Sequence, residues 1–194
     1  MKFDQVFDVQ KAFRKVMNAF AYPGTIYSLK DEAQGFEQHW ACYDATRILM
    51  YMLLDADTSF AIDTKQEELS AQFTHMTYCP LQPKELAQYV FVTREHDASM
   101  KEIIEAAKTG TLENPQLGAT LIIEVEALSE QGNYCLSGPG LKANCYKGIE
   151  CRDEWLIYRN DKNAEFPLGI DIILVDQMQQ VMALPRTTRV ERSM

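Results

Sequence analysis

The chain has 194 residues, 46% of them apolar and 24% charged, with a formal net charge of −9. This composition excludes intrinsic disorder as a description of the whole chain, and the acidic balance argues against a nucleic-acid backbone or an anionic membrane as the main partner. No apolar run approaches the roughly 20 residues of a membrane-spanning helix, and five widely spaced cysteines favour reduced thiols, so we expect a cytoplasmic protein.

The N-terminal segment predicts an amphipathic helix that packs on a sheet or on a partner. Apolar residues recur at helical spacing from Val9 to Phe20. Asp8 is the expected N-cap, and the Tyr-Pro-Gly run at 22–24 is expected to end the helix.

The next part of the chain, up to residue 110, predicts alternating helices and strands. Helices are expected over 44–55, 65–76 and 100–109, and short strands over 59–62 and 89–93. Capping-box sequences begin at Thr64 and Ser99, and Gly110 is expected to close the last helix.

The second half of the chain predicts two antiparallel hairpins separated by a helix. The first hairpin spans 120–137 with a turn at 131–133, the helix lies within 150–162, and the second hairpin joins 170–175 to 181–184. Taken with the first half, this order predicts one α/β domain over 1–194, with a mixed sheet flanked by helices.

Glu124 and Glu126 fall two residues apart on the strand predicted over 120–128. Paired carboxylates can bind a metal or act as acid and base, but no third ligand is visible. We therefore expect a solvated sheet face, or a face that meets the cations of a partner.

Two loops hold the residues best suited to contact an anion or a partner. The first loop follows a predicted strand and contains Ser137, Gly138 and Gly140. The second follows the last predicted strand and contains Arg186, Thr187, Thr188 and Arg189. Backbone N–H groups of a glycine-rich loop can form an anion nest, and arginine binds phosphate or carboxylate with two hydrogen bonds. A simple chain turn and a solvated tail are the alternatives.

No pattern in the sequence indicates a metal or a cofactor. The three histidines have no second histidine or cysteine at ligand spacing, and no Cys-x-x-Cys motif occurs. No lysine marks a cofactor Schiff base, and the glycine-rich loop matches neither nucleotide-binding fingerprint. We expect no metal site and no cofactor, and the sequence carries no catalytic signature.

Several segments, in a fixed order, nevertheless resemble a known family. They are residues 13–26, 118–122, 137–140, 166–174 and 183–191. The paired C-terminal segments are the most specific, and together the segments are similar to the H subunit (PhnH) family of the bacterial carbon–phosphorus lyase system.

The resemblance implies a role in the use of phosphonates as a phosphorus source. Members assemble with the G, I and J subunits into a core complex that forms ribose 1-phosphonate 5-triphosphate from ATP and phosphonate, and they form homodimers when isolated. The resemblance also implies a fold like the large domain of pyridoxal-phosphate-dependent transferases, without that cofactor.

Three readings of the function stay open at this point. The first is a non-catalytic assembly subunit of the phosphonate-processing complex. The second is a catalytic subunit in its own right that binds a nucleotide or a phosphonate. The third is an α/β protein unrelated to phosphonates.

Overall fold

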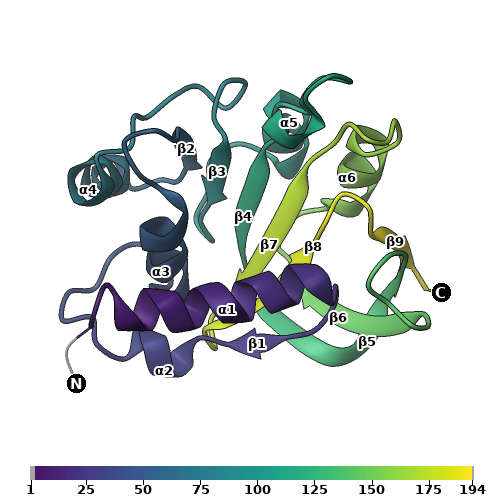
Figure 1. Cartoon of the computed structure of the whole chain (residues 1–194), viewed down its shortest axis with the longest axis horizontal. Helices are drawn as coiled ribbons and strands as arrows, with labels where there is room; N and C mark the ends of the chain where they lie inside the picture. Colours follow the sequence, from purple (N-terminus) through teal and green to yellow (C-terminus); the bar gives the residue numbers. More distant parts are fainter. Residues whose placement is uncertain (1–2, 194) are drawn as a thin grey trace.

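Four adjacent parallel strands form most of a six-stranded sheet in the computed structural model, which describes residues 3–193 (Figure 1). The parallel strands are β2 (Phe60–Asp63), β3 (Tyr89–Val92), β4 (Thr120–Val125) and β7 (Asp171–Asp176). Two antiparallel strands, β8 (Gln180–Leu184) and β1 (Tyr27–Ser28), complete the order β1-β8-β7-β4-β3-β2. The mixed sheet and the hairpin between β7 and β8 confirm the predictions.

Helices cover both faces of this sheet (Figure 1). One face packs against α1 (Phe7–Ala21), α2 (Lys30–Ala33), α3 (Asp44–Leu53) and α4 (Glu67–Thr77). The other face packs against α5 (Met100–Ala106) and α6 (Leu156–Lys162). The result is a single α/β domain with a mixed sheet flanked by helices, as the sequence predicts.

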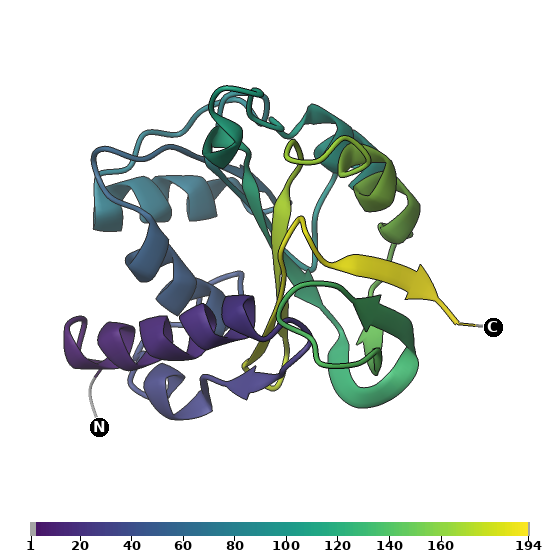
Figure 2. The same ribbon diagram turned by 45° about the vertical axis from the view of Figure 1, so that its right-hand side comes forward.

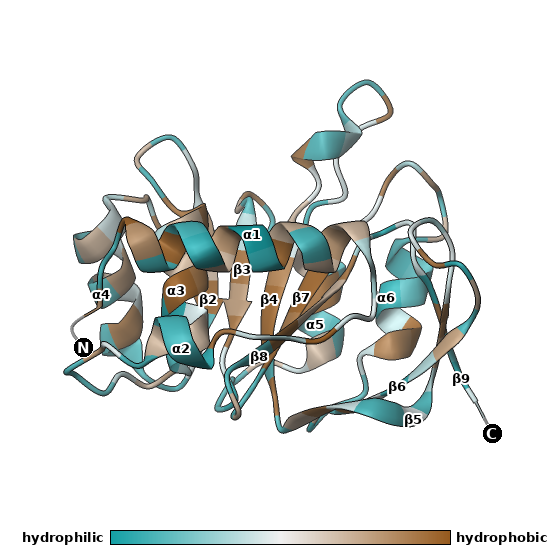
Figure 3. Cartoon of the chain, turned by 60° about the horizontal axis from the view of Figure 1, so that its bottom comes forward, coloured by the Kyte–Doolittle hydropathy of each residue, from teal (hydrophilic) through white to brown (hydrophobic). Residues whose placement is uncertain are grey.

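Alternation along each strand divides the apolar side chains between two cores. On β4, Leu121 and Ile123 belong to the core under α5 and α6, whereas Ile122 belongs to the core under α1, α3 and α4. Helices exclude water from both faces of the sheet, so the strands are almost continuously apolar. Figure 3 shows this by the brown colour of the sheet.

A second, three-stranded sheet lies beside the first and has the order β6-β5-β9 (Figure 2). Its strands are β5 (Ala127–Ser137), β6 (Cys145–Glu150) and β9 (Arg189–Arg192). A short 3-10 helix, η1 (Pro115–Leu117), precedes β4 in the chain.

The predicted hairpin over 120–137 is therefore wrong. The chain passes from the first sheet to the second after Val125, and the expected turn at 131–133 is an irregularity inside β5. Gly132 explains why: a Cβ at this position would lie 2.3 Å from the Cα of Gly148, so the glycine allows the two strands to touch rather than turning the chain. The expected helix within 150–162 is also shorter, because it begins only at Leu156.

Helix ends follow the prediction at two positions and differ at three. Helix α1 ends at Ala21, directly before the Tyr-Pro-Gly run that was expected to end it. Ser99 forms the expected capping box with Glu102 at the start of α5. In contrast, Asp4 accepts the first free N–H groups of α1, and Asp8 instead accepts the N–H of Asp4. The side chains that satisfy a helix terminus depend on the path of the preceding chain, which spacing alone does not fix.

The helix predicted after Thr64 begins three residues later, at Glu67, and the Thr64 hydroxyl accepts only the N–H of Gln66. Likewise α5 ends at Ala106, and Gly110 occupies a positive-φ turn (79°) beyond the helix. Within residues 3–193, no helix combines the length and apolarity needed to cross a bilayer.

Candidate functional site

The two loops that the sequence singles out lie side by side in the structure. Strand β5 ends where β9 begins, and Ser137 pairs with Arg189 across the two strands. Gly138 follows with φ of 124°, and a Cβ there would lie 2.9 Å from the carbonyl oxygen of Thr187. A residue without a side chain is needed for this close approach.

Around these loops the surface is hollowed into two neighbouring cavities of about 570 Å³ and 290 Å³. The larger is lined by Ser137, Gly138, Pro139, Asn163, Ala164, Phe166, Arg186, Thr187 and Arg189. The smaller shares Asn163, Ala164, Arg186 and Arg189 with it and adds Arg159, Asn160, Thr188, Val190 and Glu191. We call the two together the basic groove.

Six of the seven residues singled out from the sequence line the basic groove. The seventh, Gly140, packs on the end of α1, where a Cβ would lie 2.5 Å from the carbonyl oxygen of Ala21. A role for all seven in contacting a ligand or partner stays a prediction.

Arg186 uses its side-chain donors for hydrogen bonds within its own chain. Its Nη2 donates to Asp171 Oδ2 at 2.6 Å, its Nε lies 3.2 Å from the same oxygen, and its Nη1 donates to the carbonyl of Pro115 at 2.6 Å. The guanidinium lies over Gly118, where a Cβ would approach Nη1 to 2.8 Å. Arg186 thus braces the start of β7 against η1, which leaves it few donors for a ligand.

Arg159, which the sequence analysis missed, lies under the basic groove with only 1% of its surface exposed. Its Nη2 donates to the carbonyl oxygens of Pro185 and Thr188, both at 2.9 Å, and its Nη1 to Asn160 Oδ1 at 3.2 Å. Burial lowers the pKa of Arg159 to about 10, and the charge of Asp171 opposes this shift. The one available signal is its helical spacing from Leu156, which places it on the buried side of α6.

The basic groove also contains polar atoms without partners. Within residues 3–193, neither Nε of Arg159 nor Oγ1 of Thr188 has a hydrogen-bond partner, although both are buried. Arg189 is exposed and forms no ion pair in the same part of the chain. Chemically, such an arrangement can hold an oxyanion.

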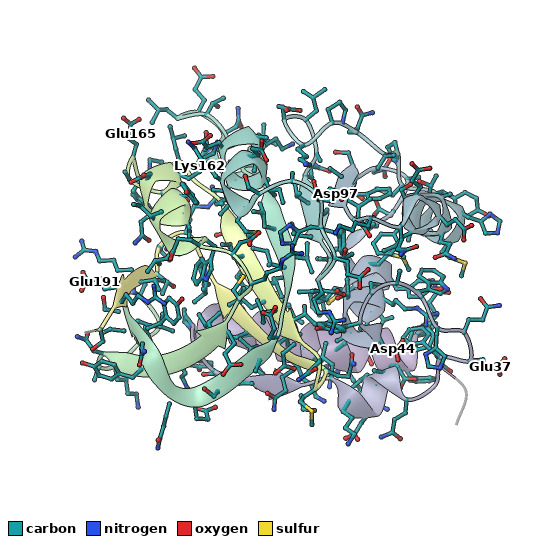
Figure 4. All side chains as sticks on the ribbon, turned by 180° about the vertical axis from the view of Figure 1, so that it is seen from behind. Glu37, Asp44, Asp97, Lys162, Glu165 and Glu191 are labelled. Carbon is teal, nitrogen blue, oxygen red and sulfur yellow. The ribbon has the colours of Figure 1, made fainter. Side chains whose placement is uncertain are left out.

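A further cavity, of about 380 Å³ and separate from the basic groove, lies at the carboxyl ends of β3 and β4. It is lined by Trp40, Ala41, Cys42, Tyr43, Arg94, Glu95 and Glu124. Figure 4 places the two sites on opposite sides of the molecule, because Asp44, next to this cavity, lies far from Glu191 of the basic groove.

Glu124 is buried and joins the segments that line this cavity by hydrogen bonds, rather than facing solvent. Only 5% of its surface is exposed, and its carboxylate accepts the N–H of Tyr43 at 2.6 Å, the hydroxyl of Thr46 at 2.7 Å and the N–H of Arg94 at 3.0 Å. Burial raises the pKa of Glu124, while these hydrogen bonds oppose the rise. The predicted solvated face is wrong because β4 lies inside a sheet covered on both sides.

The described residues contain no metal-ligand cluster, and two of their thiols are shifted away from the reactive thiolate form. No group of three or more metal-ligating side chains occurs within 3–193. Burial raises the pKa of Cys42 and raises that of Cys151 to about 11, so both thiols are protonated near neutral pH.

Comparison with known proteins identifies the family. The family described as bacterial phosphonate metabolism protein (PhnH) matches residues 2–191. The chain belongs to the PhnH family. The match includes both loops of the basic groove and the whole of the six-stranded sheet.

Two curated proteins are similar to this chain along most of their length. The Stutzerimonas stutzeri protein named "Putative C-P lyase subunit protein HtxG" is 31% identical over 183 residues, which covers 93% of this chain and 85% of HtxG. The alpha-D-ribose 1-methylphosphonate 5-triphosphate synthase subunit PhnH of Rhizobium meliloti (strain 1021) is 31% identical over 195 aligned positions, covering 97% of this chain and 93% of the relative.

Proposed function

We propose that this protein is a subunit of the carbon–phosphorus lyase core complex in phosphonate catabolism. In that role it supports the formation of ribose 1-phosphonate 5-triphosphate from ATP and a phosphonate. The observation that carries the proposal is membership of the PhnH family, together with a relative named as a subunit of a ribose 1-methylphosphonate 5-triphosphate synthase. The cytoplasm is the expected compartment for this ATP-dependent chemistry.

The proposed role is assembly rather than catalysis. Helix α1 supports this view, because its buried side consists of Ala12, Val16 and Ala19, whereas larger apolar residues face outward. The exposed fractions are 72% for Val6, 49% for Phe13 and 51% for Met17. These three exposed residues recur at helical spacing, so they lie along one side of the helix and its N-cap. Clustered exposed apolar residues of this kind mark protein–protein interfaces.

The partners proposed for this surface are the G, I and J subunits, with a homodimer when the protein is isolated. The fold is further proposed to correspond to the large domain of pyridoxal-phosphate-dependent transferases without the cofactor. The arrangement of helices on both faces of a mixed sheet is compatible with that relationship.

Copurification with tagged G, I and J subunits tests the proposal. The wild-type chain is expected to copurify with them, and the double variant Phe13→Glu, Met17→Glu is expected to be lost from the complex. Asn18→Glu, an exposed position on another side of the same helix, is the matched control and should be retained. If the wild-type chain never copurifies, and growth on a phosphonate as sole phosphorus source survives its deletion, the proposal fails.

A further inference from the structure

The electrostatic balance of the basic groove runs against that of the whole protein. The chain carries a net charge of −9, yet the groove is lined by Arg159, Arg186 and Arg189, with Glu191 as the only acidic residue among the lining residues described. Asp171 neutralises Arg186 through the ion pair at 2.6 Å. The remaining two guanidiniums therefore exceed the acidic charge at the groove and create a locally positive field.

Of these two guanidiniums, Arg159 is the one whose burial needs an explanation. A buried cation is normally paired with a carboxylate, since removal from water costs several kcal/mol. The partners of Arg159 are all neutral: two carbonyl oxygens and one amide oxygen. Its Nε has no partner within residues 3–193, nor does Oγ1 of Thr188 beside it. Asp171, whose charge acts on Arg159, is hydrogen-bonded to Arg186 and not to Arg159. A buried positive charge that has no hydrogen-bonded carboxylate of its own within residues 3–193, and that lies under a surface cavity, is what an anion-binding site requires.

Groups able to touch a ligand directly line the same groove. Arg189 is exposed and enters no ion pair among the described residues. The hydroxyl-bearing residues Ser137 and Thr187 line the larger cavity with it. A guanidinium with adjacent hydroxyl donors suits a tetrahedral oxyanion, because each oxygen can accept a separate hydrogen bond.

The size and shape of the groove admit more than an inorganic ion. The larger cavity measures about 570 Å³, within the range of roughly 300–1,000 Å³ that holds small organic ligands. Phe166 lines it and leaves 70% of its surface exposed, so its ring is accessible to a ligand. An exposed ring at the rim of a cationic groove can stack on a nucleobase.

We infer that the basic groove binds a phosphate-type dianion, carried by a phosphate ester or a phosphonate. Arg189 contacts the oxyanion directly, and buried Arg159 supplies charge from beneath. Arg186 is a brace, not a ligand-binding residue. The ligand class is consistent with the proposed function, on which the choice of phosphonate and nucleotide as probes rests.

Isothermal titration calorimetry on the full chain tests this inference with ATP, adenosine, inorganic phosphate and methylphosphonate. Binding of at least one phosphorus-containing probe, and its weakening at high salt, is expected because exposed charges are screened. Arg189→Ala should lower the affinity roughly ten- to a hundredfold, the loss expected for one charge-assisted hydrogen bond. Arg192→Ala is the matched control: it lies on the same strand, is exposed and contacts Glu154 outside the groove.

The probes also separate the possible sources of the dianion. ATP binding more tightly than inorganic phosphate, with Phe166→Ala abolishing the difference, identifies a nucleotide site. Equal binding of phosphate, methylphosphonate and ATP, unaffected by Phe166→Ala, identifies a site for the dianion alone. Both outcomes support the inference.

The inference is overturned if no phosphorus-containing probe binds at millimolar concentration, if adenosine binds as well as ATP, or if Arg192→Ala weakens binding as much as Arg189→Ala. These outcomes are independent of copurification. A chain that enters the complex but binds no dianion leaves the proposed function intact. A chain that binds dianions, never copurifies and is not needed for growth on a phosphonate overturns only the function.

Discussion

The loops at the two ends of the six-stranded sheet are held by side chains of opposite charge. At the carboxyl ends of the parallel strands, the carboxylates of Asp63, Glu124 and Asp176 are buried and accept backbone N–H groups. At the amino ends, Arg159 and Arg186 donate to backbone carbonyl oxygens. Acids therefore hold the loops at the carboxyl ends, whereas two arginines, together with Asp171, hold the loops at the amino ends.

Helix polarity accounts for part of this division, at Asp63, Glu124 and Arg159. In a strand–helix–strand unit, the helix begins near the carboxyl end of one parallel strand and ends near the amino end of the next. Asp63 accepts the N–H groups of Asp97 and Ala98 just before α5, and Glu124 accepts the N–H of Tyr43 at the start of α3. Arg159 lies in the last turn of α6. The helix dipole favours acids at its start and bases at its end, so the fold itself sorts the charges.

The largest effect is expected at the acidic end. Glu124→Ala leaves the N–H groups of Tyr43 and Arg94 and the hydroxyl of Thr46 without their acceptor. We expect a loss of about 3 kcal/mol in the free energy of unfolding, from several buried donors at once. Chemical denaturation measures it. Glu126→Ala, two residues along the chain, is the control, and an equal loss there would contradict the role assigned to Glu124.

A smaller loss is expected at the basic end. Arg186→Ala removes the partner of Asp171 and the donor to Pro115, and we expect a loss of about 2 kcal/mol because both side chains are largely buried. The double variant with Asp171→Ala should lose less than the sum of the two single changes. Additive losses in the denaturation midpoints would show that the ion pair contributes nothing.

Acid should act differently on two carboxyl groups at the same end of the sheet, Asp63 and Glu124. Burial tends to raise the pKa of Asp63, but Lys84 and the N–H groups of Asp97 and Ala98 outweigh it, and the pKa lies below the usual value. A depressed carboxyl pKa contributes stability that is present above the unfolded-state value near 3.8 and is lost as pH falls through the folded-state value.

Glu124 has the opposite sign, because burial raises its pKa. Its ionisation therefore costs stability as pH rises above its unfolded-state value. Asp63→Asn should flatten the acid limb of a plot of unfolding free energy against pH, because the pKa of Asp63 lies below its usual value in the folded state. An unchanged acid limb in this variant would argue against the role assigned to Asp63.

The smallest effect is expected at the floor of the basic groove, and it is a gain. Thr188→Val replaces a buried hydroxyl that has no partner within residues 3–193 by a methyl group of similar shape. We expect stability to rise by about 0.5–1 kcal/mol, since a buried unpaired polar group is costly. A rise in the thermal midpoint checks this. A loss of stability would mean that the hydroxyl has a partner in solution.

The sequence predicted much of the fold through local patterns. Alternating helices and strands, the β7–β8 hairpin and the capping box at Ser99 follow from spacing within a few residues. The path of the chain after Val125 could not be predicted from spacing. Strand periodicity indicates which face of a sheet a residue occupies, but not which sheet the strand joins. Gly132 looked like a turn and is a point of contact between strands.

The candidate sites show the same difference between what local sequence patterns predict and what long-range packing decides. By itself, the sequence determined the α/β class, the family resemblance and the two loops that meet in the basic groove, because each is written in residue type and spacing along the chain. Only the tertiary structure decided that Arg186 is held by Asp171, that Arg159 is buried beneath the groove and that Glu124 is enclosed. Those roles depend on which distant groups come within hydrogen-bond distance and on how much water is excluded, and the packing of the whole domain sets both.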